Sequence, residues 1–515
     1  MKNPAVYLIG AGPGDPGLIT VHGLECLRRA DVVIHDHEVH ARVLKQARPG
    51  AELIDVGSTG RQRMAQDAIT FLLAEKVREG KLVARLERGD PFVFDRGGEE
   101  ALFLHTHGIP FEVVAGIPLG IGVPAYAGVP LTYPGGGDTI TLVRGYEDDS
   151  DIVPDVDWAS LAKLDGTIVC YAGAHQLSRL FRDLASHEWS SDAQAAIVYN
   201  GSLPSQTTVT GSVAELAEQV RDHARRDPAI VIVGRVVAFR NHLRWFDERP
   251  LFGKRVLVTR PRDQAAEMVD LLSTMGAEAI EAPMIRIAPA EDTGPLRRAV
   301  DSANDFDWIV FSSANSVDAF MSALLEKGRD IRWLKVPRLC SVGTGTAERL
   351  ARFGVRPDLI PEEFHGEALV AAMAATGSLD GCRVLVPRAD IGRDVIVEGL
   401  RAAGALVSDV VAYRTVLEDA HQDDGPDVYR MLLDDAIHVV TFTSPSAVRN
   451  FATIYGREQA VDLLSRTVVA VIGPVTSEAA IQLGLTVTVQ PTVSTIAALV
   501  DAIAAHLAAA AVNTG

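Results

Sequence analysis

The sequence predicts an α/β protein built from two large domains. The chain has 515 residues, which is roughly three times the length of a typical domain of about 150 residues. Short runs rich in Val, Ile and Leu alternate with segments of helical period, a pattern typical of parallel sheets covered by helices on both faces. Residues 240–255 follow neither period and contain Pro250 and Gly253, so we expect the domain linker there.

Apolar runs on both sides of this linker are expected as strands. They are AVYLIG (5–10), DVVIHD (31–36), KLVARL (81–86), TITLVRG (139–145), GTIVCYAG (166–173), AIVIVGRVV (229–237), RVLVTRP (255–261), DWIVFSS (307–313) and RVLVPR (383–388). Since such runs occur in both halves, both domains are expected to be of the α/β class.

The composition excludes several classes of protein. Hydrophobic residues make up 47% of the chain and charged residues 23%, as in ordinary globular proteins and unlike disordered chains. The apolar stretch at 499–512 is interrupted by Asp501 and His506 and is shorter than the ~20 residues of a membrane helix, so no membrane span is expected. The chain passes from Met1 and Lys2 almost directly into a strand-like run without a signal-peptide pattern, which predicts a cytoplasmic protein.

Charge and cysteine usage narrow the range of partners. The net charge of −18 comes from 49 basic and 67 acidic residues, so nucleic acid is not an expected partner. The four cysteines lie far apart without a Cys-x-x-Cys pair, which predicts core thiols and no metal site.

The second half contains an internal repeat of three blocks in the same order. RVLVTRP (255–261) recurs as RVLVPRA (383–389), FSSANSV (311–317) as FTSPSAV (442–448), and VGTGTAERLARFG (342–354) as IGPVTSEAAIQLG (472–484). We therefore expect two similar α/β lobes that face one another across a cleft. In each lobe, two strands run into Ser-, Thr- and Gly-rich turns that open helices. Free backbone N–H groups at such turns favour anions, although helix capping alone also explains Ser and Thr there.

These blocks, together with VLVPRADIGRDVIVEGLRAAGALVSDVVAYRT (384–415), resemble uroporphyrinogen-III synthases over essentially all of 251–505. The resemblance implies a cofactor-free, two-lobed enzyme that closes hydroxymethylbilane into uroporphyrinogen III while inverting ring D. The turns that open the helices suit this substrate, because it carries carboxylates. By resemblance, the substrate-binding residues are Arg260, Ser312, Ser313, Asn315, Gly343, Thr344, Thr346, Arg388, Thr443, Ser444, Ser446, Gly473 and Thr476.

Two features of this half stay open. Arg260 and Arg388 occupy equivalent repeat positions, and each is expected either to bind a substrate carboxylate in bidentate fashion or to form a structural ion pair. Some synthases carry a tyrosine just after the second Ser-x-Ser motif as a possible acid. Arg449 and Asn450 stand there instead, so no general acid is assigned.

The first half opens with a strand, a glycine-rich turn and a helix start in AVYLIGAGPGDPGLIT (5–20). The third glycine of a dinucleotide fingerprint is missing and Pro13 and Pro16 intervene, which argues against a Rossmann site. GAGPGDP, RGDPFVFDRGGEE (88–100), PAYAGVPLT (124–132) and PAIVIVG (228–234) instead resemble tetrapyrrole methylases, especially uroporphyrinogen-III C-methyltransferase, over about 1–245.

This second resemblance implies that S-adenosylmethionine binds between two α/β subdomains and that methyl groups pass to pyrrole carbons. Asp36 matches the family's proposed base. The positions that match cofactor-lining residues are Pro13, Arg88, Gly89, Asp90, Val93, Ala172 and Gly201. The resemblance also implies a homodimer formed through this domain.

Several residues depart from the methylase pattern. Ser58 replaces a lysine proposed as proton donor, and Arg88 replaces a glycine that lets the backbone approach the cofactor. Pro118 stands at a threonine position and Ala172 at a methionine position. Arg144-Gly145-Tyr146 replaces Thr-Gly-His, and Arg61 or Arg63 is a candidate to replace the lost lysine.

We therefore expect a methylase-like domain at 1–245 followed by a synthase domain at 251–510. Three functions remain open. The chain is a synthase fused to an active methyltransferase that yields precorrin-2, a synthase with a non-catalytic methylase-like domain, or a tetrapyrrole-binding sensor without turnover. The small-molecule partners expected are hydroxymethylbilane and uroporphyrinogen III.

Overall fold

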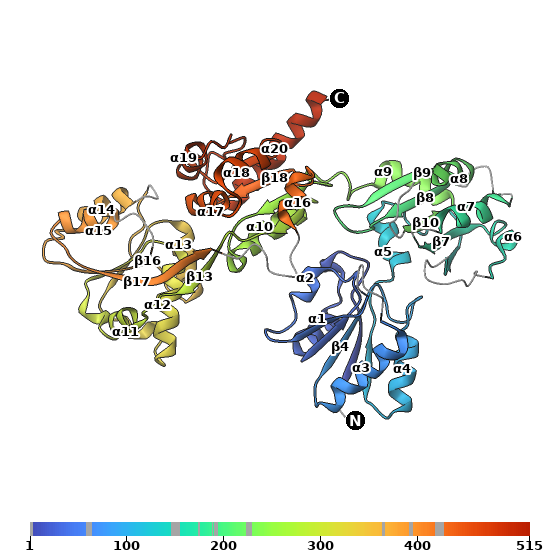
Figure 1. Ribbon diagram of the computed structural model, residues 1–515, viewed down its shortest axis with the longest axis horizontal. Coiled ribbons are helices and arrows are strands. Elements are labelled where there is room, and N and C mark those ends of the chain that lie inside the picture. Colours follow the sequence, from blue (N-terminus) through green and yellow to red (C-terminus); the bar gives the residue numbers. More distant parts are fainter. Residues whose placement is uncertain are drawn as a thin grey trace. The chain divides into compact units, whose positions relative to one another are not determined.

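The computed structural model describes residues 4–57, 64–145, 155–173, 176–187, 189, 194–222, 229–362, 366–390, 395–417 and 427–514 (Figure 1). The chain forms two compact units. The first is Met1–Arg255 with Leu271–Glu278 and Leu507–Gly515, and the second is Val256–Asp270 with Ala279–His506. Within the described part of the chain, no helix combines the length and apolarity that crossing a membrane requires.

The first unit opens with a fully parallel sheet in the order β3-β2-β4-β1-β5. Its strands are β1 (Val6–Gly10), β2 (Val32–His35), β3 (Glu52–Asp55), β4 (Val83–Glu87) and β5 (Phe111–Val114). Helices α1 (Val21–Arg29) and α2 (Ala41–Leu44) pack on one face, and α3 (Gln66–Arg78) and α4 (Gly97–Thr106) pack on the other (Figure 1). The predicted arrangement of helices on both faces is confirmed for this sheet.

The second sheet of this unit is mixed, so the prediction of parallel pairing is wrong here. Its order is β6-β7-β10-β8-β9, where β10 runs antiparallel to both neighbours and β8 runs antiparallel to β9. The strands are β6 (Thr139–Val143), β7 (Gly166–Ala172), β8 (Gln194–Tyr199), β9 (Thr207–Ser212) and β10 (Ala229–Val233). Every residue of β10 is buried between two core clusters, and burial on both faces gives the continuous apolar run that parallel strands also show.

Further helices of this unit are short. They are α5 (Leu119–Tyr126), α6 (Trp158–Leu161), α7 (Leu177–Ala185), α8 (Val213–Asp222) and α9 (Arg240–Leu243), with 3-10 helices η1 (Pro16–Leu18) and η2 (Arg235–Phe239). η2 lies directly before the expected linker, and α9 occupies its start.

The second unit contains two further sheets. One has the order β12-β11-β18-β19 and the other β13-β17-β16-β14-β15, and all pairs described are parallel except β13 with β17. The strands are β11 (Arg255–Val258), β12 (Glu278–Glu281), β13 (Ile285–Pro289), β14 (Trp308–Phe311), β15 (Arg338–Ser341), β16 (Arg383–Ala389), β17 (Leu406–Leu417), β18 (Val439–Phe442) and β19 (Val468–Val471).

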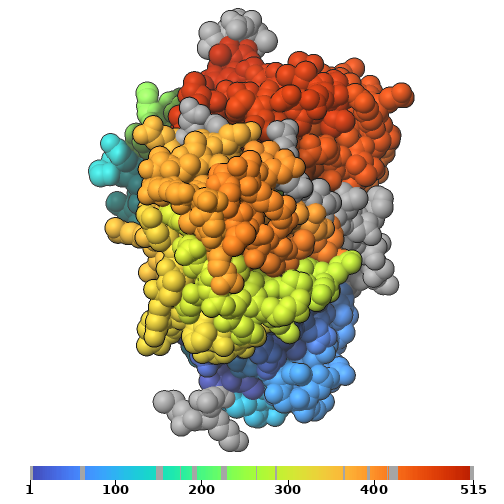
Figure 2. Space-filling model, turned by 90° about the vertical axis from the view of Figure 1, so that its left-hand side faces the viewer, coloured from blue at the N-terminus to red at the C-terminus, as the bar shows by residue number. Residues whose placement is uncertain are grey.

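Helices surround both of these sheets. They are α10 (Arg262–Thr274), α11 (Gly294–Asp301), α12 (Ala314–Glu326), α13 (Thr344–Arg352), α14 (Gly366–Ala375), α15 (Val395–Ala402), α16 (Val428–Leu433), α17 (Pro445–Tyr455), α18 (Arg457–Leu463), α19 (Pro474–Gln482) and α20 (Ile496–Thr514), with η3 (Ala303–Asp305) and η4 (Ile331–Trp333). In the five-stranded lobe, α11 and α12 pack on one face and α14 and α15 on the other, and Figure 2 shows this lobe in yellow and orange.

The two sequence repeats exchange halves between these lobes. The first strand of the first repeat, β11, pairs with β18 from the second repeat. The first strand of the second repeat, β16, pairs with β14 from the first repeat. Both sheets therefore show the same order of equivalent strands, and neither lobe consists of one repeat alone.

Three glycines meet where β1, β4 and β5 of the first sheet end. Gly89 has a φ of 81°, in the left-handed region. A Cβ on Gly116 would lie 2.1 Å from the Gly89 carbonyl oxygen, and a Cβ on Gly10 would lie 2.5 Å from the same atom. Only glycine allows the backbones to approach this closely.

Gly116→Ala is therefore expected to destabilise the first unit by roughly 1–3 kcal/mol, because the backbone must shift to admit the methyl group. The matched control is Gly98→Ala in the first turn of α4, where the added Cβ meets nothing within 4 Å. Thermal unfolding followed by circular dichroism compares both variants with the unaltered protein. Equal unfolding midpoints for Gly116→Ala and Gly98→Ala would contradict the packing argument.

Candidate active sites

The glycine-rich turn after β1 lies against the turn after β4. Gly12 and Gly89 exchange backbone hydrogen bonds, with N–O distances of 3.2 Å and 2.9 Å. Asp90 fixes its own turn because its carboxylate accepts from the amides of Phe92 and Gly116, each at 2.9 Å. The structure thus brings Pro13, Gly89 and Asp90 to one edge of the first sheet.

Contacts with the second sheet hold this turn in place. The Asp15 amide donates to Ser202 Oγ at 3.1 Å, and the Tyr126 hydroxyl donates to Asp15 Oδ2 at 2.7 Å. Burial and the neighbouring Asp15 carboxylate raise the pKa of Tyr126, so its hydroxyl stays a donor. Ser202 has a φ of 67°, which is unusual outside glycine and shows that the chain is constrained here. Gly201 precedes this residue and is thereby placed beside the turn.

Ala172 is placed in the same region by the contacts of Tyr171, which precedes it in β7. Tyr171 packs its ring edge-to-face against Phe94, with 4.9 Å between centroids, and its hydroxyl accepts from the Gly120 amide at 2.8 Å. Ala172 itself is buried. Residues next to the predicted cofactor-lining positions therefore link the two sheets, and the binding role of those positions stays a prediction.

Asp36 directly follows β2, as the sequence predicted. Its Oδ1 accepts from Arg85 Nη2 at 2.7 Å and its Oδ2 accepts from the Arg88 amide at 3.2 Å. Because β2 and β4 are parallel neighbours, their carboxyl ends place these groups together. Ser58, Arg61, Arg63 and Tyr146 lie outside the described residues.

Two further carboxyl groups lie near Asp36. Glu87 is fully buried, and neither of its carboxyl oxygens has a hydrogen-bond partner among the described residues. Burial, reinforced by the charge of Glu100, raises the pKa of Glu87 well above its usual value. Burial together with Asp36 raises the pKa of Asp95 to about 6. Sequence reasoning missed Glu87, which is a buried carboxyl group in a strand whose residues are all buried.

In the second unit, the predicted residues gather at the carboxyl ends of parallel strands. One group comprises Arg260 after β11, Thr443, Ser444 and Ser446 after β18, and Gly473 and Thr476 after β19. The other comprises Ser312, Ser313 and Asn315 after β14, Gly343, Thr344 and Thr346 after β15, and Arg388 in β16.

The four helix-opening turns are of two kinds. Ser313 and Ser444 are N-cap residues whose hydroxyls accept from the amides of Ser316 and Ala447. Gly343 and Gly473 cap α13 and α19 without a side-chain hydrogen bond. The capping explanation therefore applies to the two serines, whereas the glycine-capped turns keep their first amides free of a capping side chain.

The structure resolves one of the two alternatives for Arg388. Its Nε and Nη2 bind both oxygens of Asp409 in β17, at 2.6 Å and 2.9 Å. Arg388 therefore forms the ion pair that was one of the two alternatives, and its binding of a substrate carboxylate stays a prediction. Arg260 is half-buried after β11, and its role stays a prediction.

Tyr413 lies beside two predicted substrate-binding residues, and sequence reasoning missed it. Its hydroxyl is 3.0 Å from Ser313 Oγ, and Asn315 is a second hydrogen-bonding neighbour. β17 contains one extra residue here, because Arg388 pairs with Val411 but Ala389 pairs with Tyr413. Such a bulge redirects side chains. Burial raises the pKa of Tyr413.

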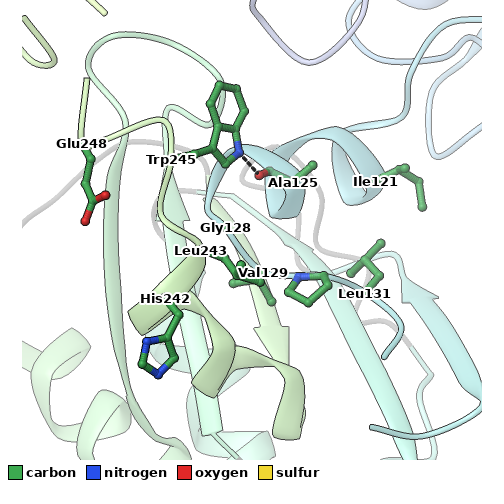
Figure 3. A pocket seen from close by; sticks show the side chains of 10 residues that line it. Ile121, Ala125, Gly128, Val129, Leu131, His242, Leu243, Trp245 and Glu248 are labelled. Carbon is green, nitrogen blue, oxygen red and sulfur yellow. Dashed lines mark hydrogen bonds between the residues drawn. The ribbon is translucent and has the colours of Figure 1, made fainter. Parts of the chain in front are cut away.

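A further pocket lies in the first unit, on the outer side of α5 (Figure 3). Its volume is about 610 Å³, and its lining is mostly apolar apart from His242 and Glu248. The Trp245 indole, at its rim, donates to the Ala125 carbonyl at 3.0 Å. None of the residues predicted from the sequence lines it.

Fold and sites together define an enzyme with two α/β domains, and comparisons with known proteins identify both. A family model for tetrapyrrole (corrin/porphyrin) methylases matches residues 5–217, and one for uroporphyrinogen-III synthase HemD matches residues 266–501. The chain is 35% identical over 481 residues to the porphyrin biosynthesis protein HemD of Ruminiclostridium josui, covering 93% of this chain and 94% of that protein.

Two methyltransferases are also similar. The uroporphyrinogen-III C-methyltransferase of Bacillus subtilis is 35% identical over 335 residues, covering 65% of this chain and 68% of that protein. A crystal structure of the Thermus thermophilus uroporphyrin-III C-methyltransferase with S-adenosylhomocysteine is 36% identical, covering 45% of this chain and 98% of that one, at a TM-score of 0.39. The chain therefore belongs to the family of porphyrin-biosynthesis proteins that join a tetrapyrrole methylase domain to a uroporphyrinogen-III synthase domain. The predicted fusion is confirmed.

The state of Glu87 gives a testable pH dependence. Its folded pKa is raised, so its contribution to stability is complete below the usual value of 4.5 and is lost as pH rises through the folded pKa. Glu87→Gln stays neutral at every pH. The unfolding free energy of the variant minus that of the unaltered protein is expected to rise above pH 4.5, by at most about 1.4 kcal/mol per pH unit.

Urea unfolding between pH 4 and 8 measures this difference. Glu99→Gln is the control because Glu99 is exposed on the same helix as Glu100. A flat difference for Glu87→Gln, parallel to that for Glu99→Gln, would show that Glu87 is ionised in the folded protein.

Proposed function

We propose that the second domain closes hydroxymethylbilane into uroporphyrinogen III and that the first domain methylates this product with S-adenosylmethionine. One observation carries the proposal. In each of three sheets, segments with predicted site residues follow parallel neighbouring strands and so begin at the same edge. The domain limits at 1–245 and 251–510, a homodimer through the first domain and a cytoplasmic location remain predictions.

The synthase proposal is supported by the glycine-capped helices. The N-caps of α13 and α19 form no side-chain hydrogen bond, and the positive ends of both helices favour carboxylates. α19 begins with Pro474, so its free N–H groups start at Val475. To close the macrocycle with ring D inverted, the enzyme must hold the linear substrate in a bent conformation. Positioning of the substrate therefore supplies most of the catalysis. Tyr413 in β17 lies within hydrogen-bond distance of Ser313 after β14, so these two hydroxyls fix one another at the same edge of the sheet.

The methylase proposal is supported by the surroundings of the glycine-rich turn. Carboxyl groups of Asp36, Glu38 and Asp95 lie around the half-buried Arg88, and this acidic surplus suits a sulfonium cation. S-adenosylmethionine, when bound, supplies an electrophilic methyl group. Pro13, Gly89 and the residues linked to them would hold it. Asp36, held at the sheet edge, would accept the proton that the substrate releases.

The direct test supplies the purified full-length protein with hydroxymethylbilane and S-adenosylmethionine. Products are oxidised, and porphyrin isomers and methylation state are resolved by chromatography with mass detection. Methylated type III product supports both activities. Type III product without added methyl mass would leave a synthase with a non-catalytic methylase-like domain, and only the spontaneous type I product would leave a binding protein.

Asp36→Asn is expected to lower the rate of methyl transfer by about 10²- to 10⁴-fold, because the amide cannot accept the proton. Type III formation should not change, since Asp36 belongs to the other domain. Calorimetry with S-adenosylhomocysteine separates this effect from cofactor binding. Methyl transfer at the unaltered rate would remove Asp36 from the role of base.

Thr443→Ala combined with Ser444→Ala is expected to lower the ratio of type III to type I product by about 10-fold, because the substrate is held less firmly. Loss of the Ser444 cap also costs about 1 kcal/mol of stability. Asp330→Ala is the control, because Asp330 caps η4, which precedes the amino end of β15. This variant also loses a helix cap, but at a distance from the predicted site. An unchanged isomer ratio in the double variant would exclude these two residues from the site.

A further inference from the structure

Arg85 is a buried cation at the carboxyl end of β4, below the proposed methylase site. It is 3% exposed, and each of its three guanidinium nitrogens makes a hydrogen bond. Nη2 binds Asp36 Oδ1 at 2.7 Å, Nε binds Glu100 Oε1 at 3.1 Å, and Nη1 binds the Leu86 carbonyl at 2.9 Å. Its planar group is thereby fixed in one orientation.

Glu100 connects this cation to the helices above the sheet. It lies in α4, is fully buried, and its Oε1 also accepts from Gln66 Nε2 of α3 at 3.0 Å. Its Oε2 has no hydrogen-bond partner among the described residues. Both helices on this face of the sheet therefore take part in fixing Arg85.

Asp36 is the most exposed of the three charged groups in this chain of contacts. Among Arg85, Glu100 and Asp36, the exposed fractions of the side chains are 3%, 0% and 14%. One carboxylate oxygen of Asp36 is fixed by Arg85, and the other receives the weaker bond from the Arg88 amide. The direction of the Asp36 carboxylate therefore depends on Arg85.

We propose that Arg85, fixed by Glu100, is a positioning residue for methyl transfer that directs the Asp36 carboxylate at the substrate. This inference rests on the proposed role of Asp36 as base. Without the guanidinium, Asp36 keeps one backbone donor and turns more freely. Only the step that uses the carboxylate is affected, and the cofactor-lining turns remain in place because their own hydrogen bonds do not involve Arg85.

The charged surroundings of Asp36 determine the pH dependence. Arg85 and Glu87 face it from β4, Arg88 from the following turn, Asp95 and Glu100 from α4 and the segment before it, and His35 and Glu38 flank it. Arg85 and Arg88 supply the positive charge next to Asp36. Loss of Arg85 therefore leaves a net negative environment, in which a carboxylate takes up protons at higher pH.

The test compares three forms of the full-length protein with the unaltered one: Arg85→Lys, Arg85→Met, and Arg85→Met combined with Glu100→Gln. The double variant removes both buried charges, so it remains informative if Arg85→Met alone does not fold. Arg48→Met is the control, because Arg48 pairs with Asp31 at the opposite end of β2. Steady-state kinetics with uroporphyrinogen III and S-adenosylmethionine give kcat and KM between pH 5 and 9.

The expected result for the double variant is a fall in kcat of about 100-fold, with KM and S-adenosylhomocysteine affinity changed less than about 3-fold. The acid limb of the kcat profile should move to higher pH. Arg85→Lys should recover part of kcat, and Arg48→Met should match the unaltered protein.

Two results would overturn the inference. A folded double variant with unaltered kcat and pH profile would show that Arg85 is only structural while the proposed function stands. An unaltered protein that forms no methylated product would refute the methylase proposal and this inference with it.

Discussion

Parallel pairing of neighbouring strands is the constraint on which every candidate site in this protein depends. Strands that run in the same direction end at one edge, so the segments that follow them meet although they lie far apart in the sequence. β4 brings Arg85 and Gly89 to the end of β1, where Gly12 lies, and to the end of β2, where Asp36 lies. The antiparallel strands β8 to β10 contribute to the site chiefly through their connections, such as Ser202.

The exchange of repeat halves makes the synthase domain a single cooperative structure. The central pairs β11–β18 and β14–β16 each join one strand from each repeat. Buried threonines reinforce the first pair, because Thr259 donates to the Thr441 carbonyl at 2.7 Å and Thr441 donates to the Leu257 carbonyl at 2.9 Å. Neither repeat can complete a sheet alone. The equivalent positions Thr346 and Thr476 are accordingly buried in both lobes.

Local patterns in the sequence predict the strands and the residues that directly follow them. They predict less well which side chains of different strands and helices contact one another. Asp36 and the Gly-capped turns directly follow strands, where resemblance to known families had indicated their roles. Arg85 lies inside a strand, where an arginine usually points to solvent, and its partner Glu100 lies on a helix fifteen residues away. Tyr413 contacts Ser313 because of a β-bulge, and a one-residue bulge cannot be recognised in the sequence of an apolar strand. Pairing direction was also hidden, because β10 is buried on both faces.

The replacements in the methylase domain bear on whether its chemistry survives. The glycine that requires left-handed backbone is Gly89, where a Cβ would lie 2.6 Å from Leu119 Cδ1, whereas residue 88 has no such φ. Arg88 is therefore compatible with the turn, and its amide still binds Asp36. Pro118 adopts an extended conformation before α5, which suits proline at a helix start. The framework around Asp36 is thus intact, and what these replacements alter is the side-chain chemistry available around it.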